Sequence, residues 1–110
     1  YLDFVARARS AGVHIPILPG LMPITSPSRL ERVLQLTGEP RPRQLAAALA
    51  DAPDVHTQRE VGIAHAARLA CEVRDGGAPG VHLYAFNNHD TVLDVLRRAR
   101  ILVTDQEKQP

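Results

Sequence analysis

The residue best suited to acid–base chemistry in this sequence is His82, which stands two positions before Tyr84 in an apolar stretch. An imidazole titrates near neutral pH and is therefore a common general base. Residues two apart on a β-strand point to the same face, so the histidine and the tyrosine would share one face. A histidine satisfied in the protein interior is the more frequent case, and we expect a structural role for His82.

The other histidines and the single cysteine do not form a metal-binding pattern. His14, His56, His65 and His89 lack metal-ligand spacing with Cys71 or with one another, so no zinc site is expected. Cys71 falls in the stripe region of a predicted helix, where we expect a small buried hydrophobe.

Neither the glycine-rich stretch nor the arginine clusters predict a phosphate site. The run 76–80 follows a predicted helix, whereas a phosphate-binding loop follows a strand. Three arginines within 97–100 crowd a helix C-terminus, where the helix dipole favours cations. Arg29 and Arg32 are typical of a solvated helix face, with ligand contact by Arg29 as the alternative.

Two apolar runs of strand length must position these residues. They cover 15–24 and 81–87, and a continuous apolar run predicts a strand buried on both faces, as in parallel sheets covered by helices. Prolines at 16, 19 and 23 cannot donate to a sheet ladder, so regular pairing is expected over only part of the first run.

Helical periodicity fills the rest of the chain. Gly62 is costly inside a helix, so we expect close packing against a neighbour there. The first three helices are predicted to end before Gly12, to run from Ser26 or Ser28 to Gly38, and to cover 43–50. A fourth helix is predicted over about 55–74, with Thr57 and Glu60 at capping-box spacing near its start. The last helix is predicted to begin after Asn88 or Asp90 and to bear the apolar residues Val92, Leu93, Leu96 and Ala99.

The composition indicates one small globular domain and excludes several classes of protein. The chain has 110 residues, 45% of them hydrophobic and 23% charged, with a net charge of +1. A net charge this small gives no electrostatic reason to expect binding to nucleic acid or an anionic membrane, and no apolar run is long enough to span a bilayer. One cysteine excludes an internal disulfide and fits a reducing compartment, so we expect a cytoplasmic location. The start at Tyr1, within a helical pattern, suggests a fragment of a longer protein.

The predicted order is helix, strand, three helices, strand and helix. Parallel strands joined by helices give an α/β fold. Two strands cannot form a stable parallel sheet alone, because both edges and both faces need cover. We therefore expect the last two βα units of a barrel over 1–103, followed by a polar tail over 104–110.

Three short stretches, taken together, resemble the methylenetetrahydrofolate reductase family. They are Pro-Gly-Leu-Met-Pro-Ile at 19–24, Arg59 with Val61-Gly62-Ile63, and His-Leu-Tyr-Ala-Phe-Asn at 82–87. The family shows PG(I/L)(M/L)P(I/V), RxxG(I/A) and HFYTLN in the same order, and the resemblance covers nearly the whole chain. It implies strands 7 and 8, with their helices, of a (β/α)8 TIM barrel.

The resemblance also implies an activity. Family members reduce 5,10-methylenetetrahydrofolate to 5-methyltetrahydrofolate, with NADH or NADPH passing hydride through FAD. The substrate-activating acid, the aspartate near the flavin and most flavin contacts lie in earlier strands, so the resemblance implies no catalytic residue here. This chain would supply one wall of the pocket that nicotinamide and folate occupy in turn, and would be inactive alone. The resemblance leaves open whether the full-length protein forms a homo-oligomer.

Four positions match substrate-binding positions of the family. Thr37 matches a threonine on the folate side of the pocket. Val33 stands where bacterial members often have a stacking aromatic residue, and Arg29 stands where a glutamine contacts the pterin. Asn88 stands where an arginine suits the carboxylate end of folate, and we hypothesise that Arg29 supplies that charge instead. The preceding Asn87 is expected to fix the loop after the last strand.

Two other functions stay open on the sequence. The chain is alternatively a non-catalytic remnant or partner module of the same fold, which upstream sequence lacking the two acidic residues would indicate. A third reading is a family member that passes hydride directly from the nicotinamide to folate. Stoichiometric FAD in an active preparation would exclude that reading.

Overall fold

A computed structural model describes residues 1–85 and 88–101 of the chain. Phe86, Asn87, and the predicted polar tail 104–110 lie outside the described residues, as does the end of the predicted domain 1–103. The elements follow the predicted order: α1 (Leu2–Ser10), β1 (Gly20–Leu21), α2 (Pro27–Thr37), α3 (Arg43–Asp51), α4 (Val55–Asp75), β2 (His82–Leu83) and α5 (His89–Arg98).

Side-chain caps explain where α2 and α4 begin. The Ser26 hydroxyl accepts a hydrogen bond from the backbone N–H of Arg29 at 3.2 Å, and Pro27 takes the first helical position. The Asp54 carboxylate accepts from the backbone N–H of Thr57 at 2.7 Å. Helix α4 therefore begins at its Asp54 cap, three residues before the predicted capping residue.

The other helix boundaries also follow local chemistry. Asn88, rather than Asp90, caps α5, because its side-chain oxygen accepts from the Thr91 N–H at 3.3 Å. Gly38 ends α2 with φ of 69° and Gly12 follows α1 with φ of 91°. This left-handed backbone is the conformation that favours glycine after a helix.

The two strands form a parallel pair. Gly20 lies opposite His82 and Leu21 lies opposite Leu83. The backbone N–H of Tyr84 extends the ladder by donating to the Leu21 carbonyl at 3.0 Å. The predicted parallel α/β arrangement is confirmed within the described residues.

The paired strands are much shorter than the apolar run that predicts β1. Ile15 and Leu18 are 66% and 55% exposed, whereas Leu21 is 8% exposed. Burial on both faces, predicted for 15–24, is therefore wrong for the first part of that run in this chain. The physical reason is that helices of the described chain cover only the end of the run, where α4 contacts β1.

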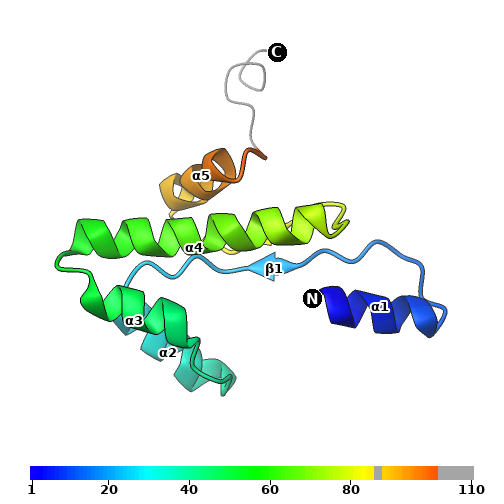
Figure 1. The fold of residues 1–110 in the computed structure, drawn as a ribbon, viewed down its shortest axis with the longest axis horizontal. Helices are drawn as coiled ribbons and strands as arrows, with labels where there is room; N and C mark the ends of the chain where they lie inside the picture. The colour runs from blue at the N-terminus through cyan, green and yellow to red at the C-terminus, as the bar shows by residue number, and fades with distance from the viewer. Residues whose placement is uncertain (86–87, 102–110) are drawn as a thin grey trace, which may run out of the picture.

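Helix α4 is the longest helix of the described residues and lies between α5 and α3, where it organises the packing (Figure 1). It contacts β1, α3 and α5, and α2 packs on α3. The main core joins α4, β1 and α5 through Leu21, Ile63, Ala66, Ala67, Ala70, Val95 and Ala99, and a second cluster joins α2 to α3 through Leu30, Leu45 and Leu49.

The apolar stripe that helical periodicity predicts for α4 is confirmed, because Ile63, Ala66, Ala67, Ala70 and Val73 are all buried. The prediction for α5 needs a correction. Val95 is fully buried, although the apolar set predicted for that helix did not include it. It lies four residues before Ala99, which is also fully buried, and four after Thr91. This spacing places the three on the helix face that packs against α4.

The long helix α4 has an exposed polar side. Arg68, Glu72 and Asp75 are exposed on it.

Across the part of the chain that the structure describes, no helix is both long and apolar enough to cross a membrane.

Candidate functional site

The two strands end at a small hollow that we call the strand-end hollow. Ligands of open and barrel α/β folds bind at the carboxyl ends of parallel strands, so this hollow lies where a ligand site is expected. Its volume is about 30 Å³. It is lined by Pro23 and Thr25 after β1, Arg29 of α2, Tyr84 and Ala85 after β2, and Asn88 and Thr91 at the start of α5.

The strand-end hollow brings together two of the four predicted substrate-binding residues, Arg29 and Asn88. They come from the first turn of α2 and the N-cap of α5, 59 positions apart in the sequence. The Asn88 side chain is already used as the cap of α5. Arg29 is the charged side chain among the described lining residues.

Thr37 and Val33 are not among the residues that line the strand-end hollow. Val33 lies one turn and Thr37 two turns further along α2 on the side of Arg29, because residues four apart share a helix face. The Thr37 hydroxyl donates to the Val33 carbonyl at 2.9 Å and accepts from the Glu39 N–H at 3.3 Å. In this structure Thr37 therefore stabilises the end of α2.

The electrostatics of the strand-end hollow favour an anionic or oxygen-rich ligand. The first turns of α2 and α5 both line it, and a helix N-terminus carries partial positive charge. Arg29 adds a full positive charge, and Thr25 and Tyr84 add hydroxyl groups. No carboxylate or imidazole is among its described lining residues. This arrangement can bind and orient a ligand, and it offers no general acid–base pair.

Sequence reasoning did not identify Thr25, Tyr84 and Thr91 as site residues. Thr91 is 6% exposed, and its hydroxyl oxygen has no hydrogen-bond partner among the residues that the structure describes. A usable signal existed for Tyr84, which follows the strand pair on the face of His82. No comparable local signal marks the two threonines, because only the pairing of β1 with β2 brings them to one place.

His82 differs from the interior histidine that the sequence predicts. It is exposed, and its ring meets the ring of Tyr84 edge-on, with centroids 4.8 Å apart and planes at 63°. The tyrosine ring in turn lies over Gly20, where an added Cβ would be 3.1 Å from its Cε2 atom. In the described chain nothing buries this face of the sheet, which explains the exposure.

Ion pairs between α4 and α5 hold the second wall of the strand-end hollow. Arg59 donates to the Asp94 carboxylate at 2.7 Å, and Arg98 pairs with Glu60. The hydrogen bond from Arg98 holds the pKa of Glu60 below its usual value. Asp94 lies one turn after Thr91, so the pairs fix α5 close to the hollow.

No metal centre is found among the residues that the structure describes, because no three His, Cys, Asp or Glu side chains lie close enough to share an ion. Cys71 is half-buried beside the main core, and its thiol contacts the Ala99 carbonyl at 3.6 Å. It packs as the small hydrophobe that the sequence predicts.

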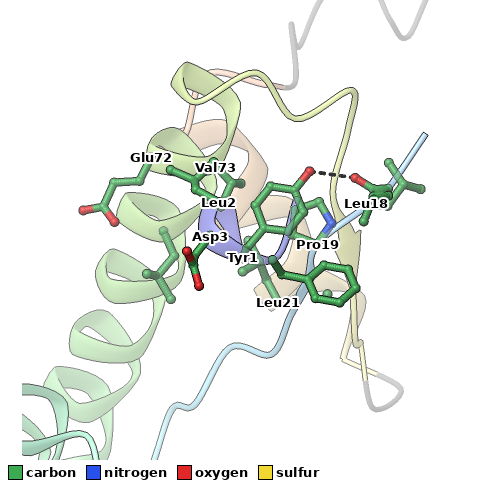
Figure 2. Close-up of a pocket in the computed structure, with 12 residues that line it drawn as sticks. Tyr1, Leu2, Asp3, Leu18, Pro19, Leu21, Glu72 and Val73 are labelled. Atoms are coloured by element: carbon green, nitrogen blue, oxygen red, sulfur yellow. Dashed lines mark hydrogen bonds between the residues drawn. The ribbon is translucent and has the colours of Figure 1, made fainter. Parts of the chain in front are cut away.

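A larger hollow of about 640 Å³ lies beside β1, between α1 and the second half of α4. Figure 2 shows Tyr1, Leu2 and Leu18 around it, with the Tyr1 hydroxyl donating to the Ile17 carbonyl at 2.7 Å. Its charged lining residues are Asp3 and Glu72. It does not lie at the carboxyl ends of the strands, so we assign the candidate ligand site to the strand-end hollow.

Fold and site together define a parallel α/β protein with a candidate ligand site at the ends of its strands. The family model described as methylenetetrahydrofolate reductase matches residues 1–100. The chain therefore belongs to the methylenetetrahydrofolate reductase family, as its three motifs predict.

Curated relatives agree with this assignment. Methylenetetrahydrofolate reductase 2 of Saccharomyces cerevisiae is 28% identical over 97% of this chain and 18% of its own length. Methylenetetrahydrofolate reductase (NADH) 1 of Arabidopsis thaliana is 29% identical over 87% of this chain and 16% of its own. A probable methylenetetrahydrofolate reductase (NADPH) of Caenorhabditis elegans is 27% identical over 86% of this chain and 14% of its own. The chain thus spans less than a fifth of the length of these relatives.

Proposed function

We propose that this chain is a segment of an enzyme that reduces 5,10-methylenetetrahydrofolate to 5-methyltetrahydrofolate. The family match over residues 1–100 carries the proposal. NADH or NADPH is the hydride donor, since relatives named for each are similarly close to this chain. We assign the reaction to a longer protein, because the chain spans so little of these relatives, and we assign no catalytic residue to this chain.

The proposal places β1 and β2 as strands 7 and 8 of a (β/α)8 barrel. Their parallel pairing supports it, as does the covering of one face by helices through Leu21 and Leu83. The other face, with His82 and Tyr84, is exposed here and would turn toward the barrel interior. The apolar hollow in Figure 2 supports packing of further elements beside β1.

Within this barrel the chain binds and orients the reduced folate. Arg29 would pair with a carboxylate of the substrate, for which a guanidinium has the right planar, two-pronged geometry. Asn88 would lie opposite it on the other wall of the strand-end hollow. Thr37 and Val33 would line the folate side further along α2.

The family resemblance implies FAD in the complete protein. The strand-end hollow of about 30 Å³ encloses neither a flavin nor a whole folate, so it can supply only part of the wall of a larger pocket. The resemblance places most flavin contacts in earlier strands. We therefore assign flavin binding to residues outside this chain, and no step of the reaction is derived through it.

The test replaces Arg29 by glutamine in the complete protein. We expect the KM for 5,10-methylenetetrahydrofolate to rise about 10-fold or more, since a charge-assisted hydrogen bond is worth about 1.5–3 kcal/mol. The KM for the nicotinamide donor is the internal reference. Steady-state kinetics with each substrate varied in turn gives both values.

Arg32→Gln is the matched control, because Arg32 is an exposed arginine on the next turn of α2 that does not line the strand-end hollow. We expect its KM to stay within about twofold of the parent. Equal effects of the two substitutions would contradict the role of Arg29. Failure of the parent protein to reduce the folate would overturn the proposed function itself.

A further inference from the structure

The two walls of the strand-end hollow are separate pieces of the chain that meet on one turn of α4. One wall runs from Thr25, after β1, into the first turn of α2 with Arg29, and the other is the start of α5. Arg59 and Gly62, three residues apart on α4, each contact one of these pieces. Residues three apart lie side by side on a helix.

Gly62 supports the first wall by backbone contact. A Cβ placed on it would lie 2.0 Å from the Ile24 carbonyl oxygen and 2.8 Å from the Thr25 Cα. Both obstacles are backbone atoms, so neither can move aside by a side-chain rotation. Helix α4 therefore sets where the chain leaves β1 and enters α2, and any side chain at 62 would displace that turn.

Arg59 supports the second wall by an ion pair. Its guanidinium donates to the Asp94 carboxylate of α5 at 2.7 Å, and the two side chains are 31% and 34% exposed. Asp94 lies one turn after Thr91, which lines the strand-end hollow. Partial burial and the short contact make this pair more constraining than a fully exposed one.

We propose that Arg59 and Gly62 are positioning residues that set the separation of the two walls of the strand-end hollow. Gly62 lets the Arg29 wall approach α4, and Arg59 holds the Asn88 wall against the same turn. The distance between Arg29 and Asn88 then depends on this turn of α4, although neither Arg59 nor Gly62 lines the hollow.

Crystal structures of the complete protein with single substitutions test the proposal. Gly62→Ala should displace the backbone at 24–29 relative to α4 and leave 88–91 in place. Arg59→Gln should displace 88–91 and leave 24–29 in place. Asp94→Asn replaces the second variant if that one fails to fold, because it removes the same ion pair together with the pair of Asp94 and Arg97 within α5.

Ala66→Gly is the control for lost stability, since it weakens α4 at a buried position one turn further without adding an atom. We expect this variant to leave both walls in place although its melting temperature is similar to that of the two test variants. Displacement of both walls by each variant, or of neither, would overturn the proposal.

A kinetic measurement extends the test and rests on the proposed function. Gly62→Ala should raise the KM for 5,10-methylenetetrahydrofolate at least about 5-fold with little change in kcat, because a small misplacement of a binding group weakens its contact. Ala66→Gly should not. If the walls move as expected and KM is unchanged, folate binding at this hollow is overturned and the positioning role stands.

Discussion

Single residues decide how closely two segments of this chain can approach each other. Two glycines differ in how readily they would accept a side chain. At Gly62 an added Cβ would meet backbone of Ile24 and Thr25. At Gly76 it would lie 2.5 Å from Cδ2 of Leu2, the far end of a side chain that is 48% exposed. The first obstacle is rigid, whereas the second can rotate away into solvent.

We therefore expect Gly76→Ala to be tolerated. Its φ of −81° suits alanine, so the free energy of unfolding should stay within about 0.5 kcal/mol of the parent or rise slightly. Thermal unfolding followed by circular dichroism measures this. A loss as large as that of Gly62→Ala would mean that Leu2 is held rigidly by α1, contrary to its exposure.

At the scale of elements, the helices are built from local caps and joined by small apolar clusters. Leu30, Leu45 and Leu49 link α2 to α3 and form a cluster separate from the main core. Glu31 of α2 pairs with Arg41 in the connector between these helices. The α2–α3 hairpin that carries Arg29 thus has its own packing and depends on few residues.

Leu49→Ala should strongly destabilise this hairpin. The side chain is fully buried, and such a truncation costs about 2–5 kcal/mol. Chemical denaturation gives the loss in the free energy of unfolding. Leu36→Ala, at a leucine of α2 that is 72% exposed, is the control and should change this free energy by less than about 0.5 kcal/mol.

Acid should weaken the helix starts and inter-element pairs. The Thr57 N–H lowers the pKa of Asp54, and hydrogen bonds from Arg41 and Arg98 lower those of Glu31 and Glu60. A lowered pKa means that the unfolded state binds more protons, so stability rises with pH through this range. The contribution is present above the usual carboxyl pKa of about 4 and is lost as pH falls through the lowered values.

Asp54→Asn tests one part of this pH dependence. Asparagine caps a helix about as well as aspartate, so the melting temperature at pH 7 should change little. The drop in melting temperature between pH 6 and pH 3 should be smaller than in the parent. An identical drop in both proteins would show that Asp54 contributes nothing to acid sensitivity.

At the scale of the whole molecule, the described chain leaves one face of its strand pair and a broad apolar hollow uncovered. His82 and Tyr84 lie on the open face, and Phe4 and Leu18, at the hollow beside β1, are 62% and 55% exposed. The chain spans 18% of the length of methylenetetrahydrofolate reductase 2 of Saccharomyces cerevisiae. A ligand site that the described residues enclose only in part binds weakly, because a substrate must be surrounded to be oriented.

We therefore predict that the 110-residue chain alone neither binds FAD nor reduces 5,10-methylenetetrahydrofolate with NADH or NADPH. Flavin absorbance after purification and a nicotinamide-oxidation assay measure the two properties. The complete protein is the positive control. Folate-dependent oxidation of the nicotinamide by the isolated chain would contradict the assignment of catalysis to residues outside it.

The sequence by itself determined what depends on neighbours along the chain. It narrowed the caps of α2 and α5 to two candidates each, of which Ser26 and Asn88 bond an N–H three residues on, and Gly12 and Gly38 adopt a backbone that other residues rarely take. The stripe of α4 follows from helical periodicity, and the family from three motifs. Each of these signals is complete within a few residues, so each is readable before folding.

Only the tertiary structure decided which distant residues meet. Arg59 belongs to one of the three family motifs, but its ion-pair partner Asp94 is 35 positions away in the sequence. Arg29 and Asn88 share a hollow because β1 pairs with β2, and the paired length itself is short because helices cover only its end. Much of the free energy that selects these contacts comes from the packing of α4 against β1, α3 and α5, which no local sequence pattern encodes.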